Sequence, residues 1–329
     1  MGWVNDPSRL ARLNAIKLQA LVRDREGADA ALEPGEFPGG AALLQGAAAW
    51  VLLAERPDRG LGGALAWAVR RGATALHVVA ESHTGTLARR AARFTMPVRV
   101  WRAEGRVLHA AAAEPLPSAV EVPSSHREFE AVIVQAGAVP NEEFGVLAGE
   151  VAGLEVCRVV DDPWLHVTRL EVGVGAHDRE AFQALHGDRP AAEALAAVVQ
   201  AVRDHRLGPD HGHPLRRLAG ERLLRHDLVS DPSPIGATRL RAVPPPVPRP
   251  NLKDAVPCAA VAEVAGRPVA VVCSAGIDLD AVPYAVDACD SLGLDRCLLV
   301  VPRRDAIEVQ RLIAALATPS VTVVPVDRP

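Results

Sequence analysis

Two stretches of the sequence, at 41–102 and 258–327, run through the same order of predicted elements. Each begins with two short apolar strands around a glycine turn, and a helix, a buried strand, a second helix and a closing strand follow. The runs ALHVVA at 75–80 and RCLLVV at 296–301 are typical of strands that are buried on both faces. The sequence therefore predicts an α/β protein, in which two similar strand-strand-helix-strand-helix-strand units flank a central mixed α/β region.

The two stretches can also be laid beside each other residue by residue. WVLLAERPDRGLGGALAWAVRRGATALHVVAE matches VAVVCSAGIDLDAVPYAVDACDSLGLDRCLLVVPR with a gap of two or three residues. This likeness indicates an internal duplication. The alternative is that any two α/β units of similar length look alike.

The length of 329 residues predicts about two domains and leaves ample chain to bury a core. Prolines 115, 117 and 123 indicate a linker, and RAVPPPVPRPN at 241–251 indicates an extended polyproline tether. We therefore expect an N-terminal α/β unit at 1–118 and a central strand and helical region at 119–243. The tether and a C-terminal α/β unit are expected at 244–329.

Helices and strands outside the two units are predicted from apolar spacing. A first helix is expected to start at Asp6-Pro7-Ser8 and end near Asp24, with an apolar face of Leu10, Leu13, Ile16, Leu18 and Leu21. A strand is expected at 131–135, and helices are expected at 191–205 and 215–227. The stretch 149–182, between the strand at 131–135 and the helix at 191–205, is expected to form two strands and the start of a helix.

Composition excludes several classes of protein. The net charge of −4 gives no general attraction to nucleic acid or to an anionic membrane. The five cysteines form no CxxC pair, which favours buried thiols in a reducing compartment over a disulfide framework or a zinc ribbon. The N-terminus has no apolar signal core, and the longest apolar run, 41–54, is too short to span a bilayer. We expect a cytoplasmic protein without a membrane segment, and the excess of Arg, Ala, Gly and Pro is typical of GC-rich bacterial genomes.

The lysines are only two, Lys17 and Lys253, so chemistry that needs an amine has few candidates. Lys17 lies on a predicted surface helix and Lys253 follows the tether. We predict that neither is catalytic.

A hairpin followed by a helix and a buried strand resembles the core of the restriction-endonuclease-like (PD-(D/E)xK) superfamily. That resemblance implies a carboxylate at one strand end and Asp/Glu-x-Lys on the next strand, holding Mg²⁺ for nucleic-acid cleavage. The second strand of the last unit reads VVCSAG, without an acid or a lysine, and the second strand of the first unit ends AERPD, with Glu55 and Asp58 but no lysine. The resemblance therefore implies a catalytically degenerate core in both units.

The central stretch carries three acids in strand-like surroundings. GEVAGLEVCRV followed by RLEVGVG places Glu150, Glu155 and Glu171 on strands that are expected to be neighbours. This outline resembles that of the RecB-like nucleases, although Asp-x-Lys would here be Glu171-Val172-Gly173. If the protein binds a divalent metal, we expect these three carboxylates to hold Mg²⁺ or Mn²⁺, because hard oxygen ligands suit those ions. The alternative is that the acids simply point to solvent from half-buried strands.

Four further patterns carry residue types that can form sites. Asp178 is placed to cap a helix that follows the VGVG turn. His205, His211 and His213 with Asp210 share one polar loop, where a solvated loop competes with a metal site. The helix at 215–227 carries Arg216, Arg217, Arg222 and Arg225, which suit a phosphate backbone or a solvated face. Ser274 lies outside any GxSxG pattern and predicts no hydrolase chemistry.

Two classes of function follow. The first is a nucleic-acid-associated protein with a degenerate restriction-endonuclease-like core, whose partner is DNA or RNA. The second is a non-enzymatic scaffold or regulatory protein, whose partner is another protein. The first requires the arginines of 215–227 and 87–102 to converge on one exposed face.

Overall fold

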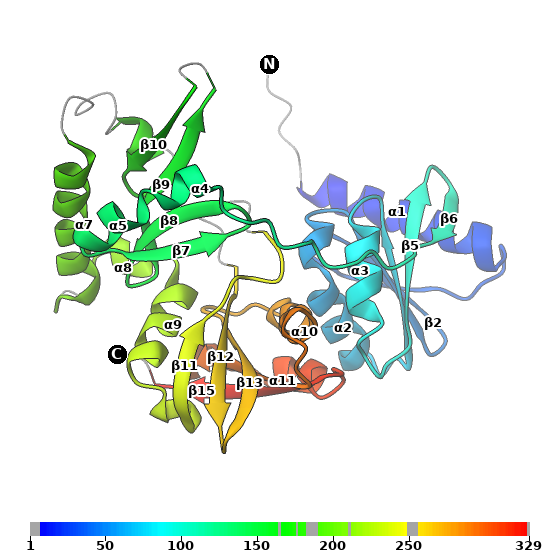
Figure 1. The fold of residues 1–329 in the computed structure, drawn as a ribbon. Helices are drawn as coiled ribbons and strands as arrows, with labels where there is room; N and C mark the ends of the chain where they lie inside the picture. Colours follow the sequence, from blue (N-terminus) through cyan, green and yellow to red (C-terminus); the bar gives the residue numbers. More distant parts are fainter. Residues whose placement is uncertain are drawn as a thin grey trace. The chain divides into compact units, whose positions relative to one another are not determined.

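The computed structural model describes residues 7–163, 166–175, 177–181, 190–209, 212–248 and 256–327. The chain forms two compact units. One contains Met1–Leu116, Ile277–Leu299 and Arg304–Pro325, and the other contains Pro117–Gly276, Val300–Arg303 and Val326–Pro329. The fold is mixed α/β with three sheets in the described residues (Figure 1).

The first sheet has the strand order β1-β2-β3-β4-β5-β6. The pairs β1–β2, β2–β3 and β5–β6 are antiparallel, whereas β3–β4 and β4–β5 are parallel. In chain order its elements are α1 (Pro7–Glu26), β1 (Glu33–Gly35), β2 (Gly40–Gln45), β3 (Ala48–Leu53), the 3₁₀ turn η1 (Pro57–Arg59), α2 (Leu61–Arg70), β4 (Ala75–Ala80), α3 (Thr84–Ala91), β5 (Val98–Glu104) and β6 (Val107–Ala110).

Strand alternation gives this sheet two buried faces. On one face, α1 packs Leu18, Leu21 and Val22 into a cluster that contains residues of all the strands β2 to β5, among them Leu43, Trp50, Leu52, Val79 and Trp101. The alternate strand residues, such as Val51 and Val78, are equally buried, and α2 and α3 contact β4 and β5. The buried strands with continuous apolar sequence are therefore covered on both sides.

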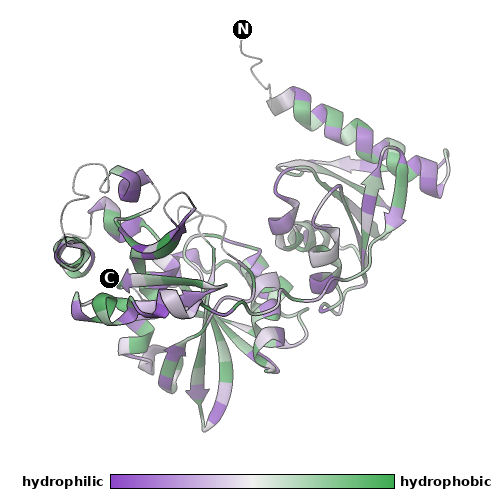
Figure 2. Cartoon of the chain, turned by 45° about the horizontal axis from the view of Figure 1, so that its top comes forward, coloured by the Kyte–Doolittle hydropathy of each residue, from purple (hydrophilic) through white to green (hydrophobic). Residues whose placement is uncertain are grey.

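The predicted apolar face of α1 is partly wrong. Leu18 and Leu21 are buried, but Leu10, Leu13 and Ile16 are exposed to 38%, 54% and 55%. The helix, which follows the N-terminal label in Figure 2, carries hydrophobic and hydrophilic residues along its whole length. Asn14 and Leu18 are buried on either side of the exposed Ile16, so the buried side of the helix passes through Asn14, Leu18, Leu21 and Val22. Leu13 and Ile16 lie on the opposite side of the helix and stay in solvent.

The third sheet has the order β11-β12-β13-β14-β15 and the same plan as the first. Its elements are α9 (Gly220–Ser230), the 3₁₀ turn η2 (Ser233–Ile235), β11 (Ala237–Ala242), β12 (Cys258–Val264), β13 (Arg267–Cys273), α10 (Ala281–Leu292), β14 (Arg296–Pro302), the 3₁₀ turn η3 (Arg303–Asp305), α11 (Glu308–Ala314) and β15 (Ser320–Val326). The predicted element order of the N-terminal module (41–102) and the C-terminal module (258–327) is confirmed. The likeness also extends upstream, because a helix and one antiparallel strand, β1 or β11, precede each module.

The modules differ at one sheet edge. In the first sheet, β6 pairs with β5 and brings His109 opposite Arg102. In the third sheet, β15 is the last strand among the described residues. Arg102 and Pro325 lie the same number of residues after Thr95 and Thr318, which stand just before β5 and β15. A proline therefore occupies the place of Arg102 in the C-terminal module.

Inside the first compact unit, helices of the two modules pack together with a reciprocal pattern. The amide of Thr95 donates to the Leu316 carbonyl at 2.8 Å, and the amide of Thr318 donates to the Arg93 carbonyl at 2.7 Å. Between them, Phe94 and Ala317 form an antiparallel bridge. Because Thr95 and Thr318 are equivalent positions, this exchange has the form of a two-fold related contact.

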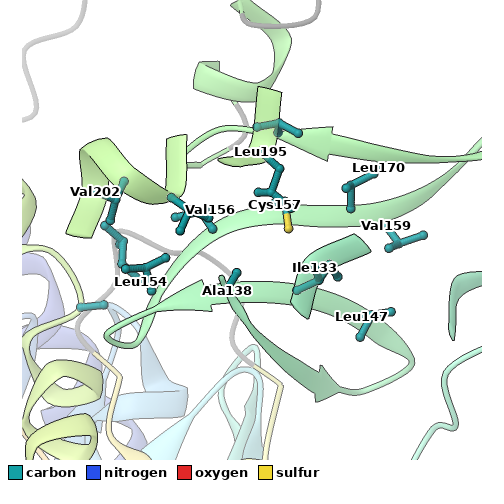
Figure 3. Close-up of a cluster of buried hydrophobic side chains, with 14 of the residues drawn as sticks. Ile133, Ala138, Leu147, Leu154, Val156, Cys157, Val159, Leu170, Leu195 and Val202 are labelled. Carbon is teal, nitrogen blue, oxygen red and sulfur yellow. The ribbon is translucent and has the colours of Figure 1, made fainter. Parts of the chain in front are cut away.

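The central sheet has the order β10-β9-β8-β7, all antiparallel. Its strands are β7 (Val139–Glu143), β8 (Val146–Val151), β9 (Leu154–Asp162) and β10 (Val167–Val172), and its helices are α4 (Ser124–Arg127), α5 (Glu130–Gln135), α7 (Ala191–Leu207) and α8 (Pro214–Arg217). Ile133 of α5 and Leu195 of α7 pack with strand residues such as Leu147, Val156 and Cys157 in one apolar cluster (Figure 3). This core holds in place the strands that carry Glu150, Glu155 and Glu171.

Three predictions for the middle of the chain are wrong. Residues 131–135 are helical, because in this stretch only Ile133 is buried, one helical turn after Phe129, and Gly137 at φ +85° ends the segment. The predicted helix 215–227 is divided at Leu218 and Ala219, and Ala219 has φ +45°. The tether predicted from 241 begins later, because residues 241 and 242 belong to β11.

In the part of the chain that the structure describes, no helix has the length and apolar character needed to cross a bilayer. The three predicted segments 1–118, 119–243 and 244–329 stay a prediction as domains.

Candidate functional site

The three acids singled out from the sequence lie on three adjacent strands. Glu150 is on β8, Glu155 on β9 and Glu171 on β10. Glu150 and Glu155 are register partners across the β8–β9 pair, next to an irregularity at Gly149. Both are buried, at 7% and 3% exposure, so their charges require partners inside the protein.

Arginines from α9 neutralise Glu150. Its carboxylate forms an ion pair with Arg222 and lies 3.7 Å from a guanidinium nitrogen of Arg225. Arg222 also binds Glu143 at 2.7 Å, and Asn141 Nδ2 donates to Glu150 at 3.0 Å. Burial alone would lower the pKa of Arg222, but Glu150 and Glu143 raise it above its ordinary value. This buried cluster therefore joins α9 to the β7–β8 hairpin through charge-assisted hydrogen bonds.

A second set of arginines holds Glu155 and Glu171. Arg158 donates two hydrogen bonds of 3.0 Å to the Glu155 carboxylate, and Arg179 Nη1 donates to it at 2.9 Å. Arg179 also lies 3.5 Å from Glu171, which accepts a bond of 3.0 Å from Arg169. The buried carboxylates thus face guanidinium groups, and the network is close to charge balance.

No group of three His, Cys, Asp or Glu side chains with the arrangement of a metal site occurs in residues 7–163, 166–175, 177–181, 190–209, 212–248 and 256–327. Binding of Mg²⁺ or Mn²⁺ by Glu150, Glu155 and Glu171 stays a prediction. A metal ion would have to compete with the arginines that already contact each of the three carboxylates.

A small polar pocket opens beside the network. It encloses about 190 Å³ and is lined by Asn141, Glu143, Phe144, Val146, Ala148, Glu155, Arg158 and Pro248. Phe144 lies at the β7–β8 turn with φ +46°, a conformation that non-glycine residues rarely adopt. The volume lies below the roughly 300–1,000 Å³ typical of small-molecule sites. The pocket suits water or a very small polar molecule rather than a nucleotide.

The other residues predicted for sites are placed as follows. Asp178 lies inside the helical stretch 177–181 and accepts a bond from the Val174 amide at 3.0 Å, so it does not precede the helix as a cap. The rings of His205 and His213 stack with centroids 3.8 Å apart, and His213 caps α8 by accepting from the Leu215 amide. Asp210 and His211 lie outside the described residues.

Some of the arginines predicted to contact phosphate are held inside the protein, whereas Arg93, Arg99, Arg102 and Arg217 are exposed. Arg216 donates to the carbonyls of Arg206 and Gly208. In the 87–102 region, Arg89 and Arg90 bind the fully buried Asp287, and Arg93 binds Asp290. Lys17 forms an ion pair with Glu81, and Lys253 lies outside the described residues.

Two functional candidates were missed in the sequence. Asp278 and Asp280 lie against the start of α2, where Arg59 binds Asp278 at 2.5 Å and the Gly62 amide donates to Asp280 at 3.0 Å. Cys258 and Cys273 are register partners across the β12–β13 hairpin. The second pair was detectable, because the two cysteines are equally distant from the Ala265-Gly266 turn.

Comparison with protein-family models, with curated proteins and with solved structures found no match to this chain.

Proposed function

We propose that the protein is a non-enzymatic scaffold or regulatory protein that binds another protein. The observation that carries this proposal is that several arginines are paired with buried carboxylates. Four of the arginines that phosphate binding would require on the surface instead neutralise buried carboxylates, namely Arg89, Arg90, Arg222 and Arg225. Arg93, Arg99, Arg102 and Arg217 stay exposed. Nucleic-acid affinity comes mainly from exposed cations that replace counterions along the phosphates.

Exposed apolar side chains support a protein partner. Leu10, Leu13 and Ile16 occupy one side of α1 at spacings of three residues and are exposed to 38%, 54% and 55%. Grouped apolar side chains in solvent are a feature of protein interaction surfaces. We refer to these three residues as the α1 stripe and propose it as the contact surface.

The test combines a loss of partners with a matched control. The double variant Leu13→Glu, Ile16→Glu removes the apolar character of the α1 stripe and leaves the buried residues of α1 unchanged. Val134→Glu changes a residue of α5 that is exposed to 55%, the same value as Ile16. Cross-linking followed by affinity purification from the native host should recover specific protein partners with wild type and Val134→Glu but not with the double variant. Identical partner sets for all three proteins would contradict the proposal.

A nucleic-acid-associated protein with a degenerate restriction-endonuclease-like core remains the second candidate. The strand-strand-helix-strand order in both modules favours it. Fluorescence anisotropy with labelled single- and double-stranded DNA and RNA at low salt decides between the two. We expect no saturable binding, whereas saturable binding that weakens steeply with salt would support the second candidate.

We also infer that the two modules descend from one duplicated unit. The reciprocal Thr95 and Thr318 bonds support this origin, because a homodimer whose subunits became fused would keep such a contact.

A further inference from the structure

Cys258 and Cys273 meet at the end of the β12–β13 hairpin. Cys258 is the first residue of β12 and Cys273 the last of β13, and the antiparallel register pairs them directly. Such partners have Cα atoms roughly 4.5–5.5 Å apart. A disulfide spans Cα separations of roughly 4.4–6.8 Å. The backbone therefore holds the two thiols at a distance that a disulfide can bridge.

The surroundings of Cys258 favour its thiolate. Burial and the charge of Glu221 raise the pKa of the Cys258 thiol, but the hydrogen bond from Cys273 and the charges of Arg225 and Arg222 outweigh them and lower it below its ordinary value. The thiolate is the nucleophilic form of cysteine, and neighbouring cations are the usual cause of its reactivity.

Cys157 provides an internal contrast in the same compact unit. It is also fully buried, but it lies in the apolar cluster of the central sheet (Figure 3). Burial raises the pKa of its thiol to about 12. Burial alone therefore does not distinguish Cys258; the thiol partner and the two arginines do.

We propose that Cys258 and Cys273 form a reversible, peroxide-sensitive thiol pair in which Cys258 is oxidised first. Both side chains are at most 2% exposed, so the oxidant must be as small as hydrogen peroxide. The Cys258 thiol also contacts the Glu221 carbonyl of α9 at 3.3 Å. Bond formation turns the sulfur toward Cys273 and releases this contact, so the oxidation state is communicated to the helix that carries Arg222 and Arg225.

The chemistry balances in two steps. The Cys258 thiolate attacks one oxygen of hydrogen peroxide, the O–O bond breaks, and hydroxide leaves to give a sulfenic acid and, with a proton, water. The Cys273 sulfur then attacks the Cys258 sulfur, and the sulfenic oxygen leaves as a second water with the Cys273 proton. The two sulfurs together lose two electrons, and the peroxide gains them. A dithiol reductant reverses the reaction by thiol–disulfide exchange.

The experiment is peptide mapping of the full chain after treatment with hydrogen peroxide. The protein is quenched, unfolded, alkylated with N-ethylmaleimide and digested. We expect one cross-linked peptide that joins Cys258 to Cys273, lighter by two hydrogens and absent after dithiothreitol. Cys157 should carry the alkyl group throughout. Oxidation of Met96, which is partly exposed, shows that the peroxide dose was sufficient.

Three variants sharpen the result. Cys258→Ser and Cys273→Ser should both abolish the cross-link, and only Cys273→Ser should accumulate sulfenic acid, trapped with dimedone at Cys258. Cys157→Ser should behave as wild type. Two alkylated thiols at Cys258 and Cys273 in wild type, at a dose that oxidises Met96, would overturn the proposal even if the serine variants fail to fold. A dimedone adduct at Cys273 rather than Cys258 would contradict the proposal that Cys258 is oxidised first.

Discussion

Arg222 is the residue on which most of the central charge network depends. It is buried and contacts both Glu143 and Glu150, so its removal leaves two carboxylates without their main cation. Breaking a buried ion pair from one side costs about 3–5 kcal/mol, because the remaining charge is uncompensated.

We therefore expect Arg222→Met to lower the free energy of unfolding by about 3–5 kcal/mol, measured by urea unfolding followed by circular dichroism. The control is Arg127→Met, which breaks an exposed pair with Glu142. A surface pair contributes less than about 1 kcal/mol. Equal losses in the two variants would contradict a special role for the network.

The arginines also decide what the three acids can bind. Isothermal titration with Mn²⁺ should give the same weak heats for wild type and for a Glu155→Ala, Glu171→Ala variant, because each carboxylate already contacts a guanidinium group. A saturable heat that is present in wild type and lost in the variant would establish the metal site at Glu150, Glu155 and Glu171.

Asp280 makes stability depend on pH. Burial raises its pKa from 3.8 to about 6 in the folded protein, and the nearby charge of Asp278 adds to the shift, against the bond from the Gly62 amide. Between these pH values the folded state binds the proton more tightly than the unfolded state. The stabilisation from this group is therefore complete below about pH 4 and is lost as pH rises through about 6.

Acidification from about pH 7 to about pH 5 should raise the urea midpoint of wild type relative to Asp280→Asn. Over this interval the difference has an upper limit of about 1.4 kcal/mol, at about 1.4 kcal/mol per pH unit, because only about one pH unit of it lies below the folded pKa. Parallel pH profiles for the two proteins would contradict the assignment. Asp24→Asn is the matched control. The hydrogen bond from Arg106 lowers the pKa of Asp24, so the stability that Asp24 contributes falls, rather than rises, on acidification.

At the scale of elements, the first turn of α2 packs closely against the chain before α10 because Gly62 has no side chain. A Cβ added to Gly62 would lie 2.2 Å from the Leu279 carbonyl oxygen, whereas one added to the adjacent Gly63 would meet nothing closer than 3.5 Å. The two glycines lie in the same helical turn, so comparing their alanine variants separates the effect of close packing from the effect of helix propensity.

Gly62→Ala should destabilise the protein by about 1–3 kcal/mol, because the helix or the backbone before α10 must move. Gly63→Ala should stabilise it by about 0.5–1 kcal/mol through helix propensity alone. Thermal unfolding of the two variants beside wild type tests both signs. If Gly62→Ala also stabilises, the close approach of α2 to Leu279 is wrong.

The elements that were predictable have local signals. The end of helix α2 has a local signal because Gly72, at φ +69°, follows it, and β4 is a continuous apolar run between polar turns. Val132, Ile133 and Val134 favour a strand by composition, yet the stretch is helical because the packing of Val132 and Ile133 against the central core overrides propensity.

At the scale of the whole molecule, the matching order of the modules was predictable because each unit repeats short local patterns. The candidate site was predictable only in part. The LEV pattern placed Glu155 and Glu171 on neighbouring strands, but Arg222 is 72 residues from Glu150. Which arginine neutralises which acid is set by how the chain folds back on itself, and no spacing along the sequence reports it.

A proline in β15, the last strand of the third sheet, affects the tendency of this protein to aggregate at high concentration. Val100 accepts from the Ala111 amide across the edge of β5, so Arg102, two residues on, directs its own backbone groups to the same side. Pro325 stands in the equivalent place on β15 and has no N–H to offer. An incoming strand from another copy finds a gap in the ladder, which is how edge strands resist aggregation. Pro325→Thr should restore the donor, and light scattering should then rise with protein concentration while wild type stays monodisperse; unchanged scattering would assign Pro325 no such protective role.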